Sequence, residues 1–550
     1  MTELTTHTLR EILVGSAKAF GSTPALGWVD EIASGGGMSY AALLYRARAL
    51  AERLAGFGLA KGDKVALFAE NRPEWGVAYF GIAAAGYVVV PILTDFGTEQ
   101  VDNIVTHAEC KAMVASQKTR AKLGPRALDL EQVPVEDLAV GPAGTLSDAE
   151  AEKAFPPLPE DSLAAIIYTS GTTGSSKGVM LSHRNIAWNS WACMDIITVG
   201  RTDSFLSVLP LAHTYECTLG LVFPMMRGAR VAYLDKPPVA SVLLPALAKL
   251  KPSIMLTVPL VMEKVYRNSV APELAKIGLY KHEWLKPLFH RIAGKKLYRK
   301  FGGRLRFFGV GGAALAPDVE KFLADAKFPY AIGYGLTETA PMLAGSAPFR
   351  TKLRAIGPRL KGVELRLADA NPQTGEGEIQ ARGPNVMKGY YKDAAKTAEV
   401  FTEDGWFRTG DTGTFDAKGR LFIKGRLKTM ILGASGENIY PEEIEALINQ
   451  HAPVAESLVY GEKGGLVALV HLKPEILEDI AKGFKDRVAD LEHAASHVLE
   501  SIRKEVNARL GAFSRIGKVK LQPEPFEKTP TQKIKRFLYP GKKDDAAAGK

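Results

Sequence analysis

The stretch SLAAIIYTSGTTGSSKGVMLSH, residues 162–183, combines a buried strand with a loop of small polar residues. The run 163–168 is apolar and has the length of a strand. Every residue of 169–176 is glycine, serine or threonine, and Lys177 follows. Backbone N–H groups and hydroxyls in a glycine-rich turn bind anions, and a lysine adds positive charge. The stretch therefore predicts a phosphate-binding loop at the end of a strand.

This loop differs from the phosphate loop of nucleotide hydrolases, which has the spacing G-x-x-x-x-G-K-[ST] and opens a helix. Here Gly171 and Gly174 are spaced differently, Gly178 follows Lys177, and the next residues alternate like a strand. A flexible surface linker is the alternative, but linkers do not usually run from one buried strand into another. We expect the loop to hold the polyphosphate of a nucleotide between two strands.

Upstream of this loop, strand and helix patterns alternate. Apolar runs at 64–69, 87–93 and 111–116 predict strands, and helix patterns begin at Pro73 and Thr98 between them. Such alternation is typical of a wound α/β fold with a parallel sheet. The chain has 550 residues, which is too long for one ordinary domain.

Downstream, the segments 377–391 and 419–432 alternate like antiparallel strands. We therefore predict the α/β class, with a large N-terminal domain over residues 1–426 made of wound α/β subdomains plus a β-rich portion.

The remaining residues, 427–550, predict a small α+β domain. A short helix is expected within 440–450, two strands around a turn within 457–472, and a long amphipathic helix within 484–510. The helix is expected to end at Gly511.

Composition narrows the cellular setting. The three cysteines, Cys110, Cys193 and Cys217, form no CxxC pair, which favours reduced thiols. The N-terminus lacks the pattern of a signal peptide, and the longest apolar run, 81–93, is too short to span a bilayer. The net charge of +10 is mild for this length. We expect a cytoplasmic protein that can touch the inner face of a membrane.

Nine motifs, in this order, resemble those of the adenylate-forming (AMP-binding) superfamily, which includes acyl-CoA synthetases, luciferases and nonribosomal adenylation domains. They are YTSGTTGSSKGVMLSH (168–183), LPLAHTYE (209–216), GVGGAAL (309–315), GYGLTETAP (333–341), GEIQARGPNVMKGYY (377–391), GWFRTGDTG (405–413), IKGRLKTMI (423–431), GENIYPEEIE (436–445) and PTQKIKR (530–536). The resemblance implies a mobile C-terminal domain with a hinge near Lys428. It also implies that a carboxylate and ATP give an acyl-adenylate and pyrophosphate, after which a thiol attacks.

The resemblance implies a set of residues that bind ATP or AMP. They are Thr169, Ser170, Gly171, Thr172, Thr173, Gly174, Lys177, Gly311, Gly312, Ala313, Gly333, Tyr334, Gly335, Thr337, Asp411 and Arg426. Among them, the loop would wrap the pyrophosphate, Thr337 would contact the α-phosphate, and Tyr334 would lie against adenine. Asp411 would accept hydrogen bonds from both ribose hydroxyls, since two vicinal hydroxyls fit one carboxylate. Arg426 would contact ribose or phosphate.

By the same resemblance, Glu338 ligates Mg²⁺ and Thr169 is its second contact, because Mg²⁺ prefers hard oxygen ligands. Each assignment has a structural alternative. Glu338 could be a surface glutamate, Tyr334 a core tyrosine, Asp411 the cap of a turn and Arg426 a solvated arginine.

Two further residues are candidates for catalysis. His213 would border the carboxylate and the α-phosphate, although a lone histidine is more often structural. Lys533 would reach the reacting oxygens from the C-terminal domain during adenylation, and Lys535 is the competing candidate. After adenylation the small domain would turn and offer the segment near Gly436 to the thiol.

The motifs around 209–216, 258–268 and 304–315 look most like those of long-chain fatty acid–CoA ligases. This implies a fatty acid, ATP and coenzyme A as substrates. An aryl-acid–CoA ligase and an acyl–acyl-carrier-protein ligase are alternatives within the superfamily. A non-catalytic lipid- or nucleic-acid-binding protein is the alternative of another class, but no nucleic-acid-binding motif is recognisable. Chain length and oligomeric state stay open.

The segment 281–306 carries nine Lys or Arg residues and a single acidic residue, Glu283. The apolar residues Trp284, Leu285, Leu288, Phe289 and Ile292 interleave with these charges. Such a pattern is compatible with peripheral contact with an anionic membrane. The more ordinary interpretation, which we favour from the sequence, is a solvated helix whose apolar face is buried.

Overall fold

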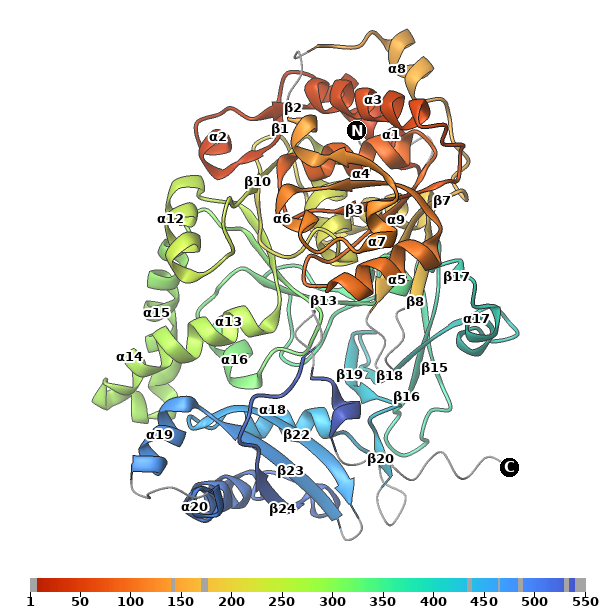
Figure 1. Cartoon of the computed structure of the whole chain (residues 1–550). Coiled ribbons are helices and arrows are strands. Elements are labelled where there is room, and N and C mark those ends of the chain that lie inside the picture. Colours follow the sequence, from red (N-terminus) through yellow and green to blue (C-terminus); the bar gives the residue numbers. More distant parts are fainter. Residues whose placement is uncertain are drawn as a thin grey trace.

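The computed structural model describes residues 7–139, 144–169, 177–432, 438–462, 465–482, 488–528 and 534–539. Figure 1 shows the first third of the chain, in red to yellow, above the green central part, with the blue C-terminal part as a separate layer below. The described residues form sheets of eight, seven, four, three and two strands.

The seven-stranded sheet contains the expected parallel strands. Its order is β17 (Gly389–Tyr390), β8 (Lys177–Ser182), β7 (Leu163–Thr169), β4 (Val88–Pro91), β3 (Lys64–Phe68), β5 (Cys110–Ala115) and β6 (Glu131–Pro134). The strands from β7 to β6 are parallel. β8 pairs antiparallel with β7, so that Thr169 lies opposite Lys177. The prediction of a strand on each side of the glycine-rich loop is therefore confirmed.

The eight-stranded sheet is also mainly parallel. Its order is β14 (Met342–Gly345), β13 (Tyr330–Gly335), β12 (Phe307–Val310), β11 (Ile254–Thr257), β9 (Ser204–Ser207), β10 (Arg230–Tyr233), β1 (Pro24–Trp28) and β2 (Met38–Ser39). The two edge strands, β14 and β2, pair antiparallel with their neighbours. Parallel sheets need helices on both faces, which explains the many helices around them.

The largest hydrophobic core joins both sheets to the helices between and around them. These helices are α1 (Leu9–Phe20), α3 (Tyr40–Gly56), α4 (Pro73–Ala84), α9 (His183–Ala192) and α11 (Phe223–Arg227). Every residue of α4 is buried. Apart from Glu74, which pairs with Arg72, this helix carries apolar or small residues all round because no side of it faces solvent.

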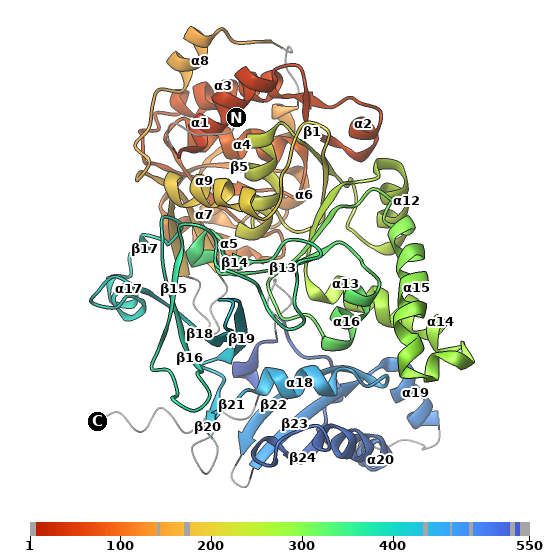
Figure 2. The ribbon, with the colours of Figure 1, turned by 180° about the vertical axis from the view of Figure 1, so that it is seen from behind.

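The other α-helices of this part of the chain surround the core helices, and Figure 2 shows several of them from behind. They are α2 (Val29–Ala33), α5 (Thr98–Ala108), α6 (Gln117–Arg120), α7 (Pro125–Leu128), α8 (Asp148–Ala154), α10 (Thr214–Glu216), α12 (Ala240–Leu250), α13 (Pro259–Val265), α14 (Ala271–Ala275), α15 (Lys286–Lys300), α16 (Pro317–Asp325) and α17 (Ala394–Val400). A π-helical stretch, Cys217–Val222, joins α10 to α11.

The predicted β-rich portion is an antiparallel sheet of four strands. Its strands are β15 (Glu364–Ala368), β16 (Gly377–Arg382), β18 (Phe407–Phe415) and β19 (Leu421–Arg426). Asp411 on β18 lies opposite Arg426 on β19. The register of this sheet therefore brings two sequence-predicted site residues together.

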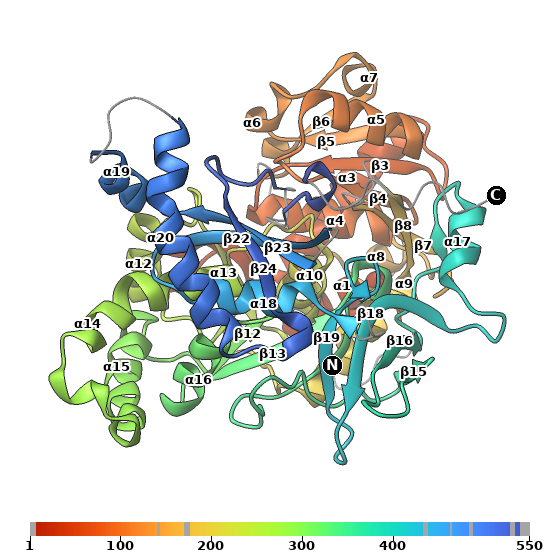
Figure 3. The ribbon, with the colours of Figure 1, turned by 90° about the horizontal axis from the view of Figure 1, so that it is seen from below.

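The C-terminal part has its own core. It contains β20 (Ile431–Leu432), β21 (Asn438–Ile439), α18 (Pro441–Ile448), β22 (Val454–Glu462), β23 (Gly465–Leu472), α19 (Pro474–Lys482), α20 (Val488–Asn507) and β24 (Ile516–Leu521). Figure 3 shows α20 lying across the sheet of β22, β23 and β24. The predicted short helix and strand pair are confirmed.

The long helix differs from the prediction at its end. The helix α20 ends at Asn507, four residues before Gly511. The amide of Asn507 bonds the backbone of Ile516 in both directions, which fixes the chain as it turns into β24.

Candidate active site

The first polar cluster joins Lys177, Tyr390 and Glu338. Lys177 begins β8, and Tyr390 lies on β17, which pairs with β8. The Tyr390 hydroxyl donates a hydrogen bond of 2.9 Å to Oε1 of Glu338. The Nζ atom of Lys177 lies 5.1 Å from the centre of the Tyr390 ring. A cation and a carboxylate therefore share one aromatic side chain at the end of the β7–β8 hairpin where Thr169 lies opposite Lys177.

The surroundings of Lys177 favour an incoming anion. Partial burial lowers the pKa of Lys177, and the nearby cations Lys396 and Lys428 lower that pKa further, while Glu338 opposes them. These positive charges repel one another, so a bound polyanion would relieve the repulsion and raise the pKa of Lys177 again. Lys396 is a positive charge that the sequence reasoning did not assign to the site.

The second polar cluster joins Tyr334, Asp411 and Arg426. The Tyr334 hydroxyl donates a hydrogen bond of 2.8 Å to Oδ2 of Asp411, and Nε of Arg426 lies 3.0 Å from Oδ1. Asp411 is 4% exposed. Tyr334 and Arg426 thus contact different oxygens of the buried carboxylate and help to hold it in place. A carboxylate is an acceptor that suits ligand hydroxyls.

One turn connects the two clusters. β13 ends at Gly335, and a short 3₁₀ turn, Thr337–Thr339, carries Glu338. The N–H of Leu336 donates to the carbonyl of Pro341 at 3.1 Å. A Cβ atom on Gly335 would lie 1.8 Å from that carbonyl oxygen, which no side chain tolerates. The glycine therefore lets the backbone fold back and place Tyr334 and Glu338 four residues apart on one turn.

A second glycine turn follows β12. The N–H of Gly311 donates to the carbonyl of Thr257 at 3.1 Å, which ties the turn to β11. Gly312 has a φ of +87°, a conformation that favours glycine. Gly312 and Ala313 are exposed, so their backbone is accessible to a ligand. This agrees with an edge against which a flat base could lie.

His213 lies partly buried at the start of α10. Its Nδ1 accepts a hydrogen bond of 3.2 Å from the N–H of Tyr215. In the neutral ring the proton is therefore on Nε2. The next turn carries Glu216, which is completely buried.

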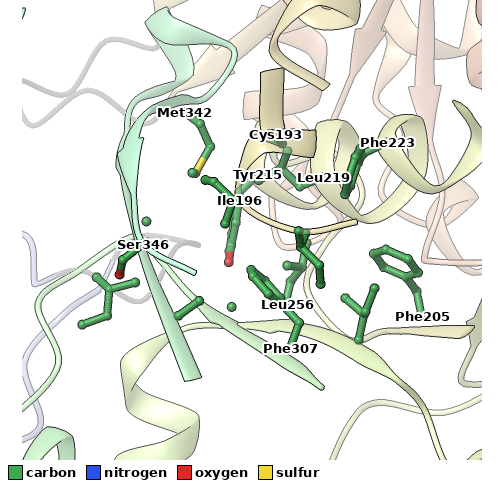
Figure 4. A pocket seen from close by; sticks show the side chains of 16 residues that line it. Cys193, Ile196, Phe205, Tyr215, Leu219, Phe223, Leu256, Phe307, Met342 and Ser346 are labelled. Atoms are coloured by element: carbon green, nitrogen blue, oxygen red, sulfur yellow. The ribbon is translucent and has the colours of Figure 1, made fainter. Parts of the chain in front are cut away.

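An apolar cavity lies beside these residues (Figure 4). About 40 Å³ of it is open to the centre of a water-sized sphere, so the cavity as it stands is smaller than the roughly 300–1,000 Å³ that is typical of ligand pockets. Its walls come from β9, β11, β12 and β13 and from the helical stretch after His213. The lining residues are Cys193, Ile196, Ile197, Phe205, Tyr215, Leu219, Phe223, Ile254, Leu256, Phe307, Gly309, Ala331, Ile332, Gly333, Met342 and Ser346.

The cavity has two distinguishable ends. Figure 4 shows Phe205 and Phe223 at one end and Ser346 and Met342 toward the other. Gly333, which also lines the cavity, directly precedes Tyr334 of the second polar cluster. None of the described lining residues is an acid, a lysine, an arginine or a histidine. The cavity therefore suits an uncharged aliphatic chain.

Several predicted site residues lie outside the described residues. They are Ser170, Gly171, Thr172, Thr173, Gly174, Gly436 and Lys533. Thr169 is described at the end of β7, Thr337 on the turn before Glu338, and Lys428 as an exposed residue after β19.

Tyr390 is the contact residue that sequence reasoning missed. It lies within one of the nine motifs, but nothing in the sequence of that motif indicates a contact between Tyr390 and Glu338. Two buried asparagines fix the backbone just after the turn that carries Glu338. Asn189 and Asn385 both donate a hydrogen bond to the carbonyl of Met342.

Fold and site together define an adenylate-forming enzyme. The chain belongs to the AMP-binding enzyme family, whose sequence profile matches residues 14–391. The peroxisomal long chain acyl-CoA synthetase 6 of Arabidopsis thaliana is 30% identical over 478 residues, which cover 78% of this chain and 67% of that protein. The long-chain-fatty-acid–CoA ligase FadD15 of Mycobacterium bovis is 30% identical over 78% of this chain and 76% of its own length.

Among solved structures, MatB of Rhodopseudomonas palustris with bound ATP is similar to this chain. It is 27% identical, the match covers 97% of this chain and 98% of that one, and the TM-score is 0.72. The resemblance noted in the nine motifs is thus confirmed over nearly the whole length. In the described part of the chain, no helix is long and apolar enough to cross a membrane.

Proposed function

We propose that this protein is an AMP-forming long-chain fatty acid–CoA ligase. It converts a fatty acid and ATP into an acyl-adenylate and pyrophosphate, and coenzyme A then displaces AMP to give the thioester. The observation that carries this proposal is the uncharged cavity, whose lining residue Gly333 directly precedes Tyr334. Its apolar lining suits a long acyl chain, which would widen the narrow cavity by displacing lining side chains while its carboxylate stays next to the nucleotide clusters.

The first step needs an in-line attack of the carboxylate on the α-phosphorus of ATP, and the protein mainly positions and neutralises the groups. Asp411 holds the ribose, and Tyr334 lies against the adenine. Nε2–H of His213 donates to the carboxylate or α-phosphate oxygen. Lys177 and the loop that precedes it neutralise the departing pyrophosphate.

Mg²⁺ is the metal that we propose for this site. Its ordinary environment is one or two carboxylates together with substrate phosphates and water, which the single carboxylate of Glu338 fits. Glu338 and Thr169 would hold it. When bound, Mg²⁺ would withdraw negative charge from the phosphate oxygens. The Tyr390 hydroxyl orients the carboxylate of Glu338 for this task.

The second step requires a different arrangement of the two domains that we propose, 1–426 and 427–550. Rotation about Lys428 would withdraw Lys533, which acts in adenylation, and bring the segment near Gly436 to the incoming thiol. A hinge absorbs such a rotation at a few backbone positions. Lys428 follows β19 directly and is exposed, which suits that position.

A substrate panel tests the proposal. Acetate, octanoate, palmitate, oleate and benzoate are supplied with ATP and Mg²⁺, and pyrophosphate and AMP are measured with and without coenzyme A. We expect the highest kcat/KM for a long-chain acid and AMP release that depends on coenzyme A. Preference for benzoate would favour an aryl-acid ligase. Release of AMP with acyl carrier protein but not with coenzyme A would favour a carrier-protein ligase.

We also propose a cytoplasmic location and peripheral contact between the basic segment 281–306 and an anionic membrane. A long-chain fatty acid partitions into lipid, so an enzyme that consumes it gains from working at a bilayer surface.

A further inference from the structure

Large apolar side chains are exposed around the first half of α15. Trp284 is 78% exposed, Leu279 is 58%, Leu288 is 54% and Ile292 is 49%. From the sequence we favoured burial of the apolar face of segment 281–306. The structure shows that this prediction is wrong for Trp284, Leu288 and Ile292. Single exposed apolar residues are ordinary, but a contiguous group marks an interaction surface.

The reason for this exposure is that the inward face of α15 is already occupied. His290, Gly294 and Leu297 are buried toward α16, where Gly294 meets Ala326. Nδ1 of His290 pairs with Asp325 at 2.9 Å. A satisfied histidine and a glycine thus form the packing face. Leu288 and Ile292 lie one turn apart on the opposite face.

The same surface is strongly basic. Its exposed cations are Lys281, Arg291, Lys295, Lys296, Arg299 and Lys300. Among the described residues no ion pair holds any of these six, whereas Glu283 pairs with Lys286 and Glu273 pairs with Lys276. Their charge is therefore available to a partner.

The structure also shows that the last two arginines of segment 281–306 are bonded to the protein itself. Arg306 pairs with Asp203 at 2.6 Å, and Arg304 donates to the carbonyl of Thr202. These two arginines bond back to the loop before β9. What we call the α15 surface comprises residues 277–300, which are the basic segment up to Lys300 together with the four residues before it. Figures 1, 2 and 3 all show α14 and α15 at the outer edge of the molecule.

We propose that the α15 surface docks this enzyme on the anionic leaflet of a membrane. Trp284, Leu288 and Ile292 enter the headgroup region, and the six cations contact lipid phosphates around them. Positive charge beside exposed apolar residues complements a surface that is both anionic and apolar. The inference rests on the proposed function, because a long-chain acid is held in such a membrane.

α15 is also connected to the cavity. The chain leaves α15 and enters β12 seven residues later, and Phe307 and Gly309 of β12 line the apolar cavity. Docking through α15 would therefore hold the cavity strands at a fixed position relative to the lipid.

Co-sedimentation with vesicles tests the surface directly and without any catalytic step. The full chain is mixed with phosphatidylcholine vesicles with and without phosphatidylglycerol, at low and at high salt. We expect binding that requires phosphatidylglycerol and weakens with salt. Trp284→Glu with Leu288→Glu should weaken binding by about tenfold or more, and Lys295→Glu with Arg299→Glu should do the same.

A matched control uses Leu128, which is 56% exposed on α7 outside this surface. Leu128→Glu should leave vesicle binding unchanged. Equal binding of neutral and anionic vesicles would overturn the proposal, and so would unchanged binding of both double variants. Sedimentation that needs an added acidic protein rather than lipid would overturn it in favour of a protein partner.

Activity separates this inference from the proposed function. With soluble octanoate, all variants should release AMP at the same rate, which also shows that they fold. With palmitate supplied in anionic vesicles, only the α15 variants should slow down. If the wild-type protein activates no fatty acid, the proposed function fails while the vesicle binding remains measurable.

Discussion

Tyr390 shows how one hydroxyl can support a charged site. It donates to Glu338, and its ring lies under the ammonium group of Lys177. Burial raises the pKa of Tyr390, and the charge of Glu338 raises it further, so the hydroxyl remains a donor at neutral pH.

Tyr390→Phe keeps the ring and removes only the hydrogen bond. A hydrogen bond to a charged group contributes about 1.5–3 kcal/mol, so we expect kcat/KM to fall by about 10- to 100-fold. Higher Mg²⁺ should restore part of the activity if Glu338 is a metal ligand. Tyr391→Phe is the control, because Tyr391 donates to exposed Glu109 at the surface. Equal effects of both substitutions would contradict the role of Tyr390.

Glu216 is a buried acid on the turn after His213. Its Oε1 accepts a hydrogen bond of 2.6 Å from Ser207, and among the described residues Oε2 has no partner. Burial raises the pKa of Glu216 from 4.5 to about 8. The carboxyl is therefore protonated in the folded enzyme at neutral pH.

This protonation makes stability depend on pH. Between the unfolded and folded pKa values, the unfolded chain has already lost the proton that the folded chain keeps. Stability is therefore full below pH 4.5 and falls by about 1.4 kcal/mol per pH unit up to about pH 8. Glu216→Gln should remove this loss, so its advantage in denaturant midpoint should grow from pH 5 to pH 8. Glu403→Gln, at an exposed position, should show no such trend.

At the scale of elements, residues within one contiguous motif could be predicted from the sequence, whereas contacts between strands of a sheet could not. The turn with Glu338 and the strand with Asp411 each lie in one short motif, and the structure describes both. The loop that the sequence also predicts lies outside the described residues, apart from its ends at Thr169 and Lys177. Tyr390 and Glu338 are 52 residues apart in the sequence, and Tyr390 is placed by the pairing of β17 with β8. No local sequence pattern indicates such a pairing.

The outward face of α15 was not predictable for a similar reason. The periodicity identified an amphipathic helix, but packing decided which side is buried. A histidine could turn inward because Asp325, on another helix, satisfies it. The apolar side chains were then left at the surface.

Phe223, the first residue of α11, helps to form one end of the apolar cavity. Phe223 is 3% exposed and stands with Phe205 at one end of the cavity. Phe223→Ala should lengthen the cavity and raise the preference for longer over shorter acids by about tenfold, measured as a ratio of kcat/KM values. Met226→Ala is the control, since Met226 is equally buried on α11 but does not line the cavity. An equal change in the ratio would contradict this assignment.

At the scale of the whole molecule, contacts between residues on the two sides of position 426 hold the observed arrangement. Tyr440 donates to Glu376 at 3.2 Å, and Arg267 donates to the carbonyl of Gln450 at 3.4 Å. Lys424, which lies on the same side as Glu376, pairs with that carboxylate as well. Mostly polar contacts of this kind can exchange for water. They suit a domain that must turn between two reaction steps.

Lys533 provides the test of that rotation. The residues on each side of it are anchored to the C-terminal part, since Lys528 pairs with Glu456 at 2.9 Å and Arg536 pairs with Glu445. If the rotation withdraws Lys533 after adenylation, Lys533 contributes to the first step alone.

Lys533→Ala should reduce pyrophosphate release by about 100-fold or more, because it removes a charge that stabilises the transition state. Thioester formation from supplied acyl-adenylate should change little. Lys535→Ala is both the control and the rival assignment, because Lys535 pairs with Glu527 at 3.3 Å. Loss of both steps in Lys533→Ala would show that the lysine stays in the site throughout. Loss of adenylation in Lys535→Ala alone would move the role to that residue, while leaving a two-step rotation in place.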